Sequence, residues 1–291
     1  MQYFSIAGFI VAIDERICRY KYIENILCNF IYPSVESHPL LTVNIGQIAD
    51  FQEYESHTCI EELDIESYYR REGNVFFRKM VSQNTLLRSK FYEKENHTFE
   101  MVVDFSQNAK CGTMLYYLLR WACCIAFLHR QTLGFHSSTI VYENKSVLFL
   151  GKSGTGKSTH SQLWLDNIEG SELLNDDAPF VQISDNKVFT WGTPWSGKTH
   201  CLKNFSAQTA AFVLLEQAPF NKIHKLSLYE ALAVILGASR FFYFNDEFFT
   251  DKNYEIISEI LKKVPVYYMQ CLPTAAAAQL VFDTLKSDEI L

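Results

Sequence analysis

Gly151-Lys-Ser-Gly-Thr-Gly-Lys-Ser158 constrains this chain of 291 residues more than any other stretch of its sequence. A glycine, four residues and then Gly-Lys-Ser is the spacing of a phosphate-binding loop. The apolar residues 146–150 before it indicate a strand, and residues 159–165 after it can open a helix. Glycines let the backbone turn its N–H groups inward, and the helix N-terminus adds a dipole that favours an anion. The sequence therefore predicts a nucleotide phosphate site.

Each residue type in the octet has an expected role. The loop amides would surround the phosphates of ATP, and Lys157 would reach the terminal phosphates. The hydroxyl of Ser158 would hold Mg²⁺. We therefore expect ATP and Mg²⁺ as cofactors. The expected nucleotide-binding residues are Gly151, Ser153, Gly154, Thr155, Gly156, Lys157, Ser158 and Thr159.

Composition and charge narrow the class of protein. With 48% hydrophobic and 20% charged residues the chain is an ordinary globular sequence, long enough for two domains. Its formal net charge of -7 argues against nucleic-acid and anionic membrane partners. A nucleotide remains compatible with that charge, because a local group of N–H donors and lysines can dominate one cleft.

Cysteine usage and the apolar segments indicate a cytoplasmic protein with free thiols. The chain has 8 cysteines but no Cys-x-x-Cys pair, which argues against a zinc site. Residues 4–13 are apolar and are followed by Asp14-Glu15, which favours a strand over a signal peptide. Residues 114–128 are apolar apart from Arg120, and we expect a buried helix rather than a membrane span.

The chain is expected to divide near residue 110. Residues 1–110 contain strand-like segments, including a hairpin of residues 86–92 and 98–105, and form a β-rich accessory or recognition domain. Residues 111–291 form the domain with the phosphate-binding loop. Helices and strands alternate there, so the fold class is α/β with a mixed sheet, of the α+β kind.

Capping residues and helix-breaking residues locate the elements of the second domain. Ser227 and Glu230 form a capping box for a helix that ends near Gly237. Asp251 can cap a helix that stops before Pro265, and Thr274 caps the final helix. The other expected elements are a helix over 112–129, strands over 133–142, 147–150, 172–174 and 266–269, a helix to residue 167 and a hairpin of 180–183 and 188–191.

Two adjacent carboxylates form the second half of the predicted site. Asp176 and Asp177 end the strand that follows the loop and its helix. One carboxylate can hold Mg²⁺ and the other can accept a proton from an attacking hydroxyl. We expect Ser158 and Asp177 as metal ligands, while the choice of base stays open between the two aspartates. The alternative is a solvated turn before Pro179.

Two further segments supply candidate catalytic residues. His136 lies on the strand before residues 147–150, whose end can approach the loop, or it is a structural histidine. Residues 191–200 combine two tryptophans, two glycines, a proline and Lys198. This loop could close over a substrate with Lys198 on a phosphate, or it could be a rigid turn that Trp191 and Trp195 anchor in the core.

Residues 112–283 resemble the HPr kinase/phosphorylase and phosphoenolpyruvate carboxykinase superfamily. The resemblance rests on His136-Ser-Ser, the glycine-rich octet, Leu-Leu-Asn-Asp-Asp at 173–177 and Val-Pro-Val-Tyr-Tyr at 264–268. The chain is most similar to HPr-kinase-like proteins of unassigned substrate, which share a Pro-Trp-Ser-Gly-Lys segment like that at 194–198. The segment with which HPr kinases engage HPr has no clear match, and the first 110 residues do not resemble their N-terminal domain.

The resemblance implies transfer of a nucleotide phosphate to a hydroxyl, usually that of a serine, within a phosphate-loop core of HPr kinase type. Asp176 or Asp177 would be the base and its neighbour a magnesium ligand. The expected partners are a nucleotide and a hydroxyl-bearing small molecule, peptide or protein, and the sequence leaves open whether the chain is a homo-oligomer. The alternative function is a non-catalytic regulatory protein that binds a nucleotide or phosphometabolite.

Overall fold

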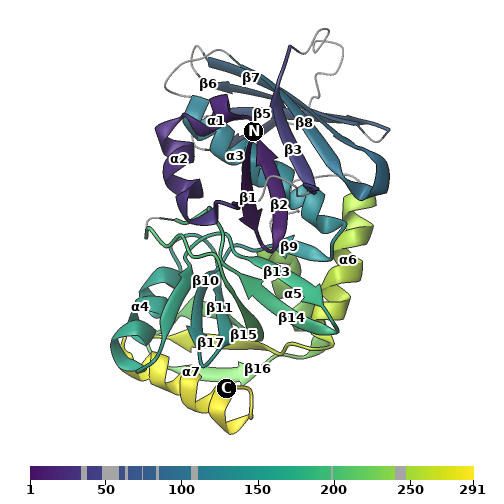
Figure 1. Ribbon diagram of the computed structural model, residues 1–291. Coiled ribbons are helices and arrows are strands. Elements are labelled where there is room, and N and C mark those ends of the chain that lie inside the picture. Colours follow the sequence, from purple (N-terminus) through teal and green to yellow (C-terminus); the bar gives the residue numbers. More distant parts are fainter. Residues whose placement is uncertain are drawn as a thin grey trace. The chain divides into compact units, whose positions relative to one another are not determined.

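The protein is described here from a computed structural model, which describes residues 1–33, 38–47, 59–62, 65–73, 75–82, 85–105, 111–197, 199–239 and 247–291. It is a mixed α/β protein with mixed sheets (Figure 1). The chain divides into two compact units, Met1–His129 and Arg130–Leu291, so the division lies after residue 129 rather than at residue 110. The helix α3 (Cys111–Leu128) accounts for the difference, because it packs within the first unit.

The first unit is built on an eight-stranded sheet with the order β1-β2-β3-β8-β7-β6-β5-β4. Its strands are β1 (Gln2–Ile6), β2 (Phe9–Ile13), β3 (Leu41–Ile45), β4 (Cys59–Glu62), β5 (Ile65–Glu72), β6 (Val75–Ser82), β7 (Thr85–Glu93) and β8 (Phe99–Phe105). The expected hairpin of β7 and β8 is confirmed. Residues 4–13 are not one strand, because Ala7 and Gly8 both adopt positive φ and turn β1 back on β2.

The helix α3 fills the core of the first unit. It is long and apolar enough to cross a membrane, but 83% of it is buried within the structure. Its Trp121 ring lies 5.7 Å from Phe91 of β7, edge to face. It also packs against α2 (Lys21–Leu27), which follows α1 (Glu15–Cys18) and precedes η1 (Cys28–Phe30). Burial on these sides is what the sequence predicts for a core helix.

The second unit is built on a nine-stranded mixed sheet. Its strands are β9 (Thr132–Gly134), β10 (Ser138–Tyr142), β11 (Lys145–Leu150), β12 (Glu172–Asn175), β13 (Phe180–Ser184), β14 (Lys187–Trp191), β15 (Ser206–Gln217), β16 (Lys222–Lys225) and β17 (Val266–Cys271). The path β12-β10-β11-β15-β14-β13-β9 is extended by β17 on β15 and by β16 on β17. The neighbours β11, β15 and β17 are parallel, so their carboxyl ends share one edge.

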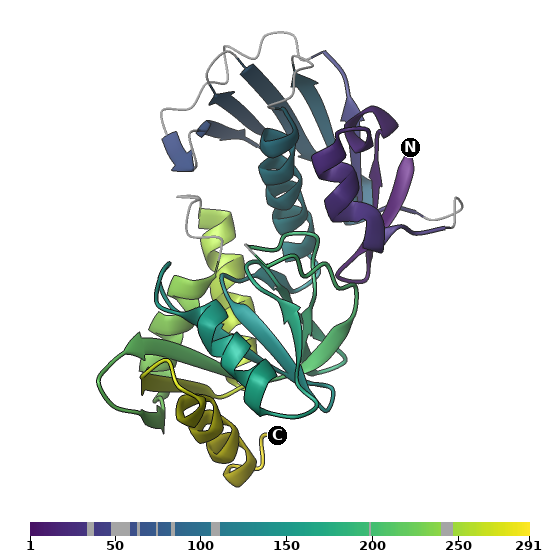
Figure 2. The same cartoon turned by 90° about the vertical axis from the view of Figure 1, so that its left-hand side faces the viewer.

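Helices cover this sheet (Figures 1 and 2). They are α4 (Lys157–Asn167), α5 (Leu228–Ala238), α6 (Glu247–Leu261) and α7 (Ala275–Ser287). Trp164 of α4 and Val281 of α7 join Phe149 of β11 in one buried cluster. The helices α5 and α6 pack on each other, and α6 also contacts β9. This packing fixes the start of α4, where the glycine-rich octet lies.

Three expectations for the second unit need correction. Residues 133–142 form two strands, β9 and β10, with residues 135–137 between them. The helix α6 already begins at Glu247, so Asp251 lies inside it and does not cap it. Thr274 is the N-cap residue of α7 but makes no capping hydrogen bond with its side chain, whereas the capping box of Ser227 and Glu230 is confirmed.

Candidate functional site

The glycine-rich octet connects β11 to α4, as the sequence predicts. Gly151, Gly154 and Gly156 have φ of 148°, 83° and 105°. Residues with a Cβ rarely adopt such backbone angles, whereas glycine adopts them readily because it has no Cβ. A Cβ at Gly151 would also lie 3.1 Å from the Thr155 side chain. The loop therefore has the compact form that brings backbone N–H groups to the start of a helix.

The lysine of the loop is buried and held against its backbone. Lys157 Nζ donates to the carbonyl oxygens of Gly151 at 2.9 Å and Lys152 at 3.3 Å. Ser158 and Thr159, the next residues of α4, are exposed. The ammonium group is thus held across the loop.

The acidic turn after β12 is fixed by the buried amide of Asn175. Its Oδ1 accepts from the backbone N–H groups of Asp177 at 3.0 Å and Ala178 at 2.8 Å. Its Nδ2 donates to the hydroxyl of Thr193 at 3.2 Å and the carbonyl of Trp195 at 3.3 Å. Buried polar atoms are costly unless they are paired, so these bonds hold the turn in one shape.

A chain of hydrogen bonds links this turn to α4. Ser138 Oγ of β10 donates to Asp176 Oδ1 at 2.7 Å and lies 2.6 Å from Ser161 Oγ. All three side chains are buried. Ser161 lies one helical turn after Ser158 on α4, and side chains at that spacing are neighbours on a helix surface. The carboxylate of Asp176 is therefore linked through Ser138 to Ser161, on the helix that begins at the glycine-rich loop.

The second aspartate has different surroundings. Asp177 Oδ1 lies 3.7 Å from His136 Nε2, and both side chains are partly exposed. Residues 135–137 run beside the acidic turn, since Ser137 N donates to the Asp177 carbonyl at 3.3 Å. Two residues that the sequence singled out are thus brought together, and this carboxylate, unlike that of Asp176, is accessible to solvent.

The loop of residues 191–200 packs against the same turn. A Cβ at Gly197 would lie 2.9 Å from the Asp176 carbonyl. Trp195 is buried edge-on against Phe180 at 5.9 Å, and Trp191 Nε1 donates to Gln182 at 2.9 Å. The two tryptophans therefore anchor the loop. Lys198 lies outside the described residues.

We expect Gly192→Ala to destabilise the protein, because its Cβ would lie 2.1 Å from the carbonyl oxygen of Lys203, a backbone atom that cannot turn away. Forcing such a contact typically costs about 1–3 kcal/mol, measurable as a lower midpoint of urea unfolding. Gly237→Ala in α5 is the matched control, since its Cβ would meet nothing within 4 Å. Equal midpoints for the Gly192 variant and the unchanged protein would contradict the close approach.

Two cavities border the glycine-rich loop on the side of β15 and β17. One, of about 550 Å³, is lined by loop and α4 residues and by Gln217, Pro219 and Pro273. The other, of about 540 Å³, includes Lys152 and Tyr268. Among the described lining residues neither includes the acidic pair. In the sheet order β12-β10-β11-β15, the acidic turn and the cavities lie on opposite sides of β11.

The larger cavity contains a histidine that the sequence analysis missed. Burial lowers the pKa of His160 to about 4, so the imidazole is neutral at pH 7. It packs edge-on against Phe149 at 4.6 Å, and its Nε2 has no hydrogen-bond partner among the described atoms. Gln217 Nε2, also missed, donates to the carbonyls of Gly154 and Thr155 at 3.3 Å each. The position of His160 three residues after Lys157 was the available signal.

Comparison with known proteins adds a weak likeness. The sequence matches no known family and no curated protein. Among solved structures the chain is similar to the HPr(Ser) kinase/phosphatase from Coxiella burnetii, with 15% identity and a TM-score of 0.34. That match covers 54% of this chain and 98% of the other. A likeness of this size carries no argument about activity, so the function rests on the site itself.

Proposed function

We propose that the second unit is a Mg²⁺-dependent kinase of HPr-kinase-like type, which moves the γ-phosphate of ATP to a hydroxyl group. The hydrogen bonds from Asp176 through Ser138 to Ser161 carry this proposal. They couple an acidic turn to the helix that starts at the glycine-rich loop. A loop that only binds phosphate needs no such carboxylate, whereas phosphoryl transfer needs a metal ligand and a base.

The sides of the site support separate places for nucleotide and acceptor. The triphosphate would lie along the loop, with the nucleobase and ribose in the cavity beside β15 and β17. The acceptor would approach from the acidic turn, where His136 and Asp177 are partly exposed. In such an arrangement the acceptor hydroxyl and the leaving ADP lie on opposite sides of the γ-phosphorus, as in-line transfer requires.

The two carboxylates have surroundings that suit different roles. Asp176 is buried and bonded toward α4, which suits a magnesium ligand working with Ser158. Asp177 is more exposed and lies near His136, which suits the base. This assignment differs from the sequence analysis, which expected Asp177 rather than Asp176 as a metal ligand. Hydroxyl and carboxylate oxygens are the donors that Mg²⁺ prefers, so the residues fit the ion.

The reaction asks mainly for positioning and charge compensation. Asp177 takes the proton of the acceptor hydroxyl while the oxygen of that hydroxyl forms a bond to the γ-phosphorus. The bond between this phosphorus and the β,γ-bridging oxygen breaks, and ADP is released. Lys157 and the loop amides offset the charge of the phosphates. When bound, Mg²⁺ would offset the charge that develops on the β- and γ-oxygens.

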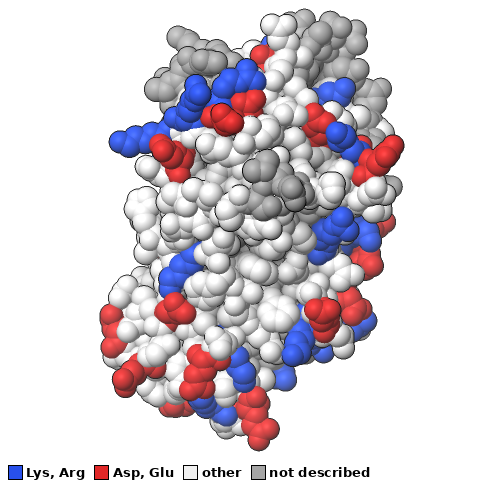
Figure 3. Space-filling model, in the orientation of Figure 1, with Lys and Arg blue, Asp and Glu red and all other residues white. Residues whose placement is uncertain are grey.

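The proposal extends to the setting of the reaction. All seven cysteines with described side chains are thiols, which fits a cytoplasmic protein. On the face shown in Figure 3, acidic and basic side chains are intermixed over both units. We propose that the acceptor is a hydroxyl-bearing small molecule, peptide or protein and that the first unit helps to select it.

Calorimetry of the full chain with ATP, in the presence and absence of Mg²⁺, tests the nucleotide site. We expect saturable binding that Mg²⁺ strengthens. To test transfer, the protein is incubated with γ-labelled ATP and fractionated metabolite or peptide mixtures. The measurement is the label that appears on a hydroxyl group of an acceptor. Binding without transfer or hydrolysis would instead favour a regulatory nucleotide-binding protein, and failure to bind at millimolar ATP would reject both.

A further inference from the structure

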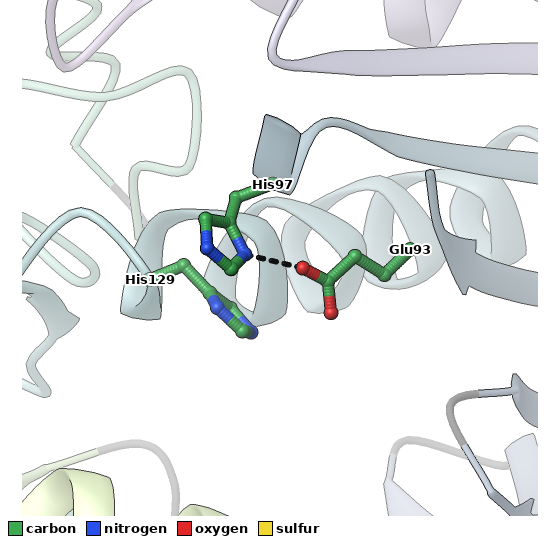
Figure 4. A group of neighbouring side chains, drawn as sticks. All are labelled: Glu93, His97 and His129. Carbon is green, nitrogen blue, oxygen red and sulfur yellow. Dashed lines mark hydrogen bonds and ion pairs between the residues drawn. The ribbon is translucent and has the colours of Figure 1, made fainter. Parts of the chain in front are cut away.

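Three side chains of the first unit converge on one point. Figure 4 shows Glu93, His97 and His129 pointing toward one another. They come from the end of β7, from η3 (Glu95–His97) and from the residue after α3. Their ligand atoms all lie within 4.8 Å of one another. We propose that they bind a divalent transition-metal ion of the Zn²⁺ class and leave one coordination position open to water.

The scaffold of this cluster is rigid at two of its three members. Glu93 pairs with Phe99 across the β7–β8 hairpin. The buried Phe99 ring stacks on Phe91 at 5.3 Å and lies 5.0 Å from the ring of His129. Packing against the core thus orients His129, and the strand register orients Glu93. Preorganised ligands are what a metal site needs, because little freedom is then lost on binding.

The third member is brought in by the turn between β7 and β8. Asn96 and His97 have φ of 57° and 52°, and His97 Nδ1 then lies within hydrogen-bond distance of Glu93 Oε1. Two successive residues of positive φ are the ordinary geometry of a tight hairpin turn, and the chain repeats it at Glu143-Asn144 and Asp185-Asn186. The turn between β7 and β8 therefore places the His97 side chain, which is 66% exposed, beside Glu93.

The donor set indicates the class of metal. Two imidazoles and one carboxylate form the protein ligand set of open zinc sites, and imidazole favours Zn²⁺, Co²⁺, Ni²⁺ and Cu²⁺ over Mg²⁺ and Ca²⁺. Tetrahedral bonds of about 2.05 Å separate ligand atoms by about 3.4 Å. The rings of His97 and His129 face each other at 5.7 Å and 28°, so side-chain rotations of modest size reach that spacing.

Charge around the cluster also favours a cation. The ammonium of Lys94, next to Glu93, pairs with Glu100 at 3.1 Å. Asn44 Nδ2 donates to the same carboxylate at 2.8 Å. The ammonium of Lys94 is therefore paired with Glu100, while the Glu93 carboxylate contacts His97 within the cluster. The sequence argued against a zinc site because it has no Cys-x-x-Cys pair, but a ligand set of two histidines and one glutamate contains no cysteine.

Titration of the untagged, nucleotide-free full chain with ZnCl₂ tests the site by calorimetry, and CoCl₂ reports its geometry through the visible bands of tetrahedral Co²⁺. We expect one ion per chain. His97→Ala, His129→Gln and Glu93→Gln should each lower the affinity at least tenfold, since loss even of an outer partner of a ligand costs about 10–100-fold. The ion should also raise the melting temperature, and the variants should lose that rise.

Controls separate this site from other metal-binding groups. His224→Ala removes an exposed histidine elsewhere, Glu95→Gln a neighbouring carboxylate and Cys28→Ser an exposed thiol, and none should change the affinity. Melting curves without metal establish that each variant is folded. Absence of binding at 0.1 mM Zn²⁺ (about 5.5 kcal/mol of binding free energy), or binding that the three ligand variants leave unchanged, would overturn the proposal.

Discussion

Lys157→Ala is expected to abolish binding of Mg-ATP in calorimetry with the full chain. The Lys157 ammonium now contacts two loop carbonyls and would exchange them for phosphate oxygens. Each hydrogen bond to a charged group contributes about 1.5–3 kcal/mol, so two such bonds correspond to roughly 10²–10⁴-fold in affinity. In the upper part of this range, calorimetry at millimolar nucleotide would detect no binding.

Lys187→Ala is the control for that experiment. Lys187 is an exposed lysine at the start of β14, outside the loop and the linings of both cavities. Its variant should keep the affinity within a few-fold. A melting curve without nucleotide shows whether Lys157→Ala is folded, because the buried alkyl chain also contributes packing. Undiminished ATP affinity in a folded Lys157 variant would remove the nucleotide site.

Asp177→Asn is expected to lower the rate of phosphoryl transfer by about 10²–10⁴-fold, the usual contribution of a positioned base. The amide keeps the shape of the side chain but cannot take the proton of the acceptor. Nucleotide affinity should change little. The rate is measured with the identified acceptor, or as release of phosphate when water replaces the acceptor.

The neighbouring carboxylate is expected to act differently. Asp176→Asn should weaken the dependence of ATP binding on Mg²⁺, because the buried Asp176 is coupled to α4 through Ser138. Asp185→Asn, an exposed aspartate in the β13–β14 turn, serves as the control for both variants. Full transfer activity in Asp177→Asn, or an unchanged Mg²⁺ dependence in Asp176→Asn, would contradict the roles that we propose.

Local patterns in the sequence were sufficient for most elements around the glycine-rich loop. The octet, the strand before it and the helix after it lie where the spacing predicts, because glycine torsions and apolar runs act over a few residues. The longest strand, β15, was not assigned. Its residues 209–213 are all buried, so it lacks the alternation of apolar and polar residues that marks a strand exposed on one face.

Longer-range pairing was beyond the sequence. The sequence grouped α3 with the second domain, whereas α3 packs within the first unit, because its apolar face indicates burial but not which sheet buries it. Nothing local indicates that Ser138 and Ser161 bond to Asp176, since the three lie on β10, α4 and the turn after β12. The convergence of Glu93, His97 and His129 depends in the same way on the hairpin register and the end of α3.

The amino-acid order fixes the conformations that depend on neighbouring residues: the glycine-rich turn, the capping box at Ser227 and the apolar run of α3. Folding alone selects which of these come together, because sheet register and helix packing join residues far apart in the chain. The Asp176 carboxylate, linked through Ser138 to α4, and the imidazoles beside Glu93 therefore gain their chemical setting from packing. A side chain acquires its role from the neighbours that the folded backbone supplies.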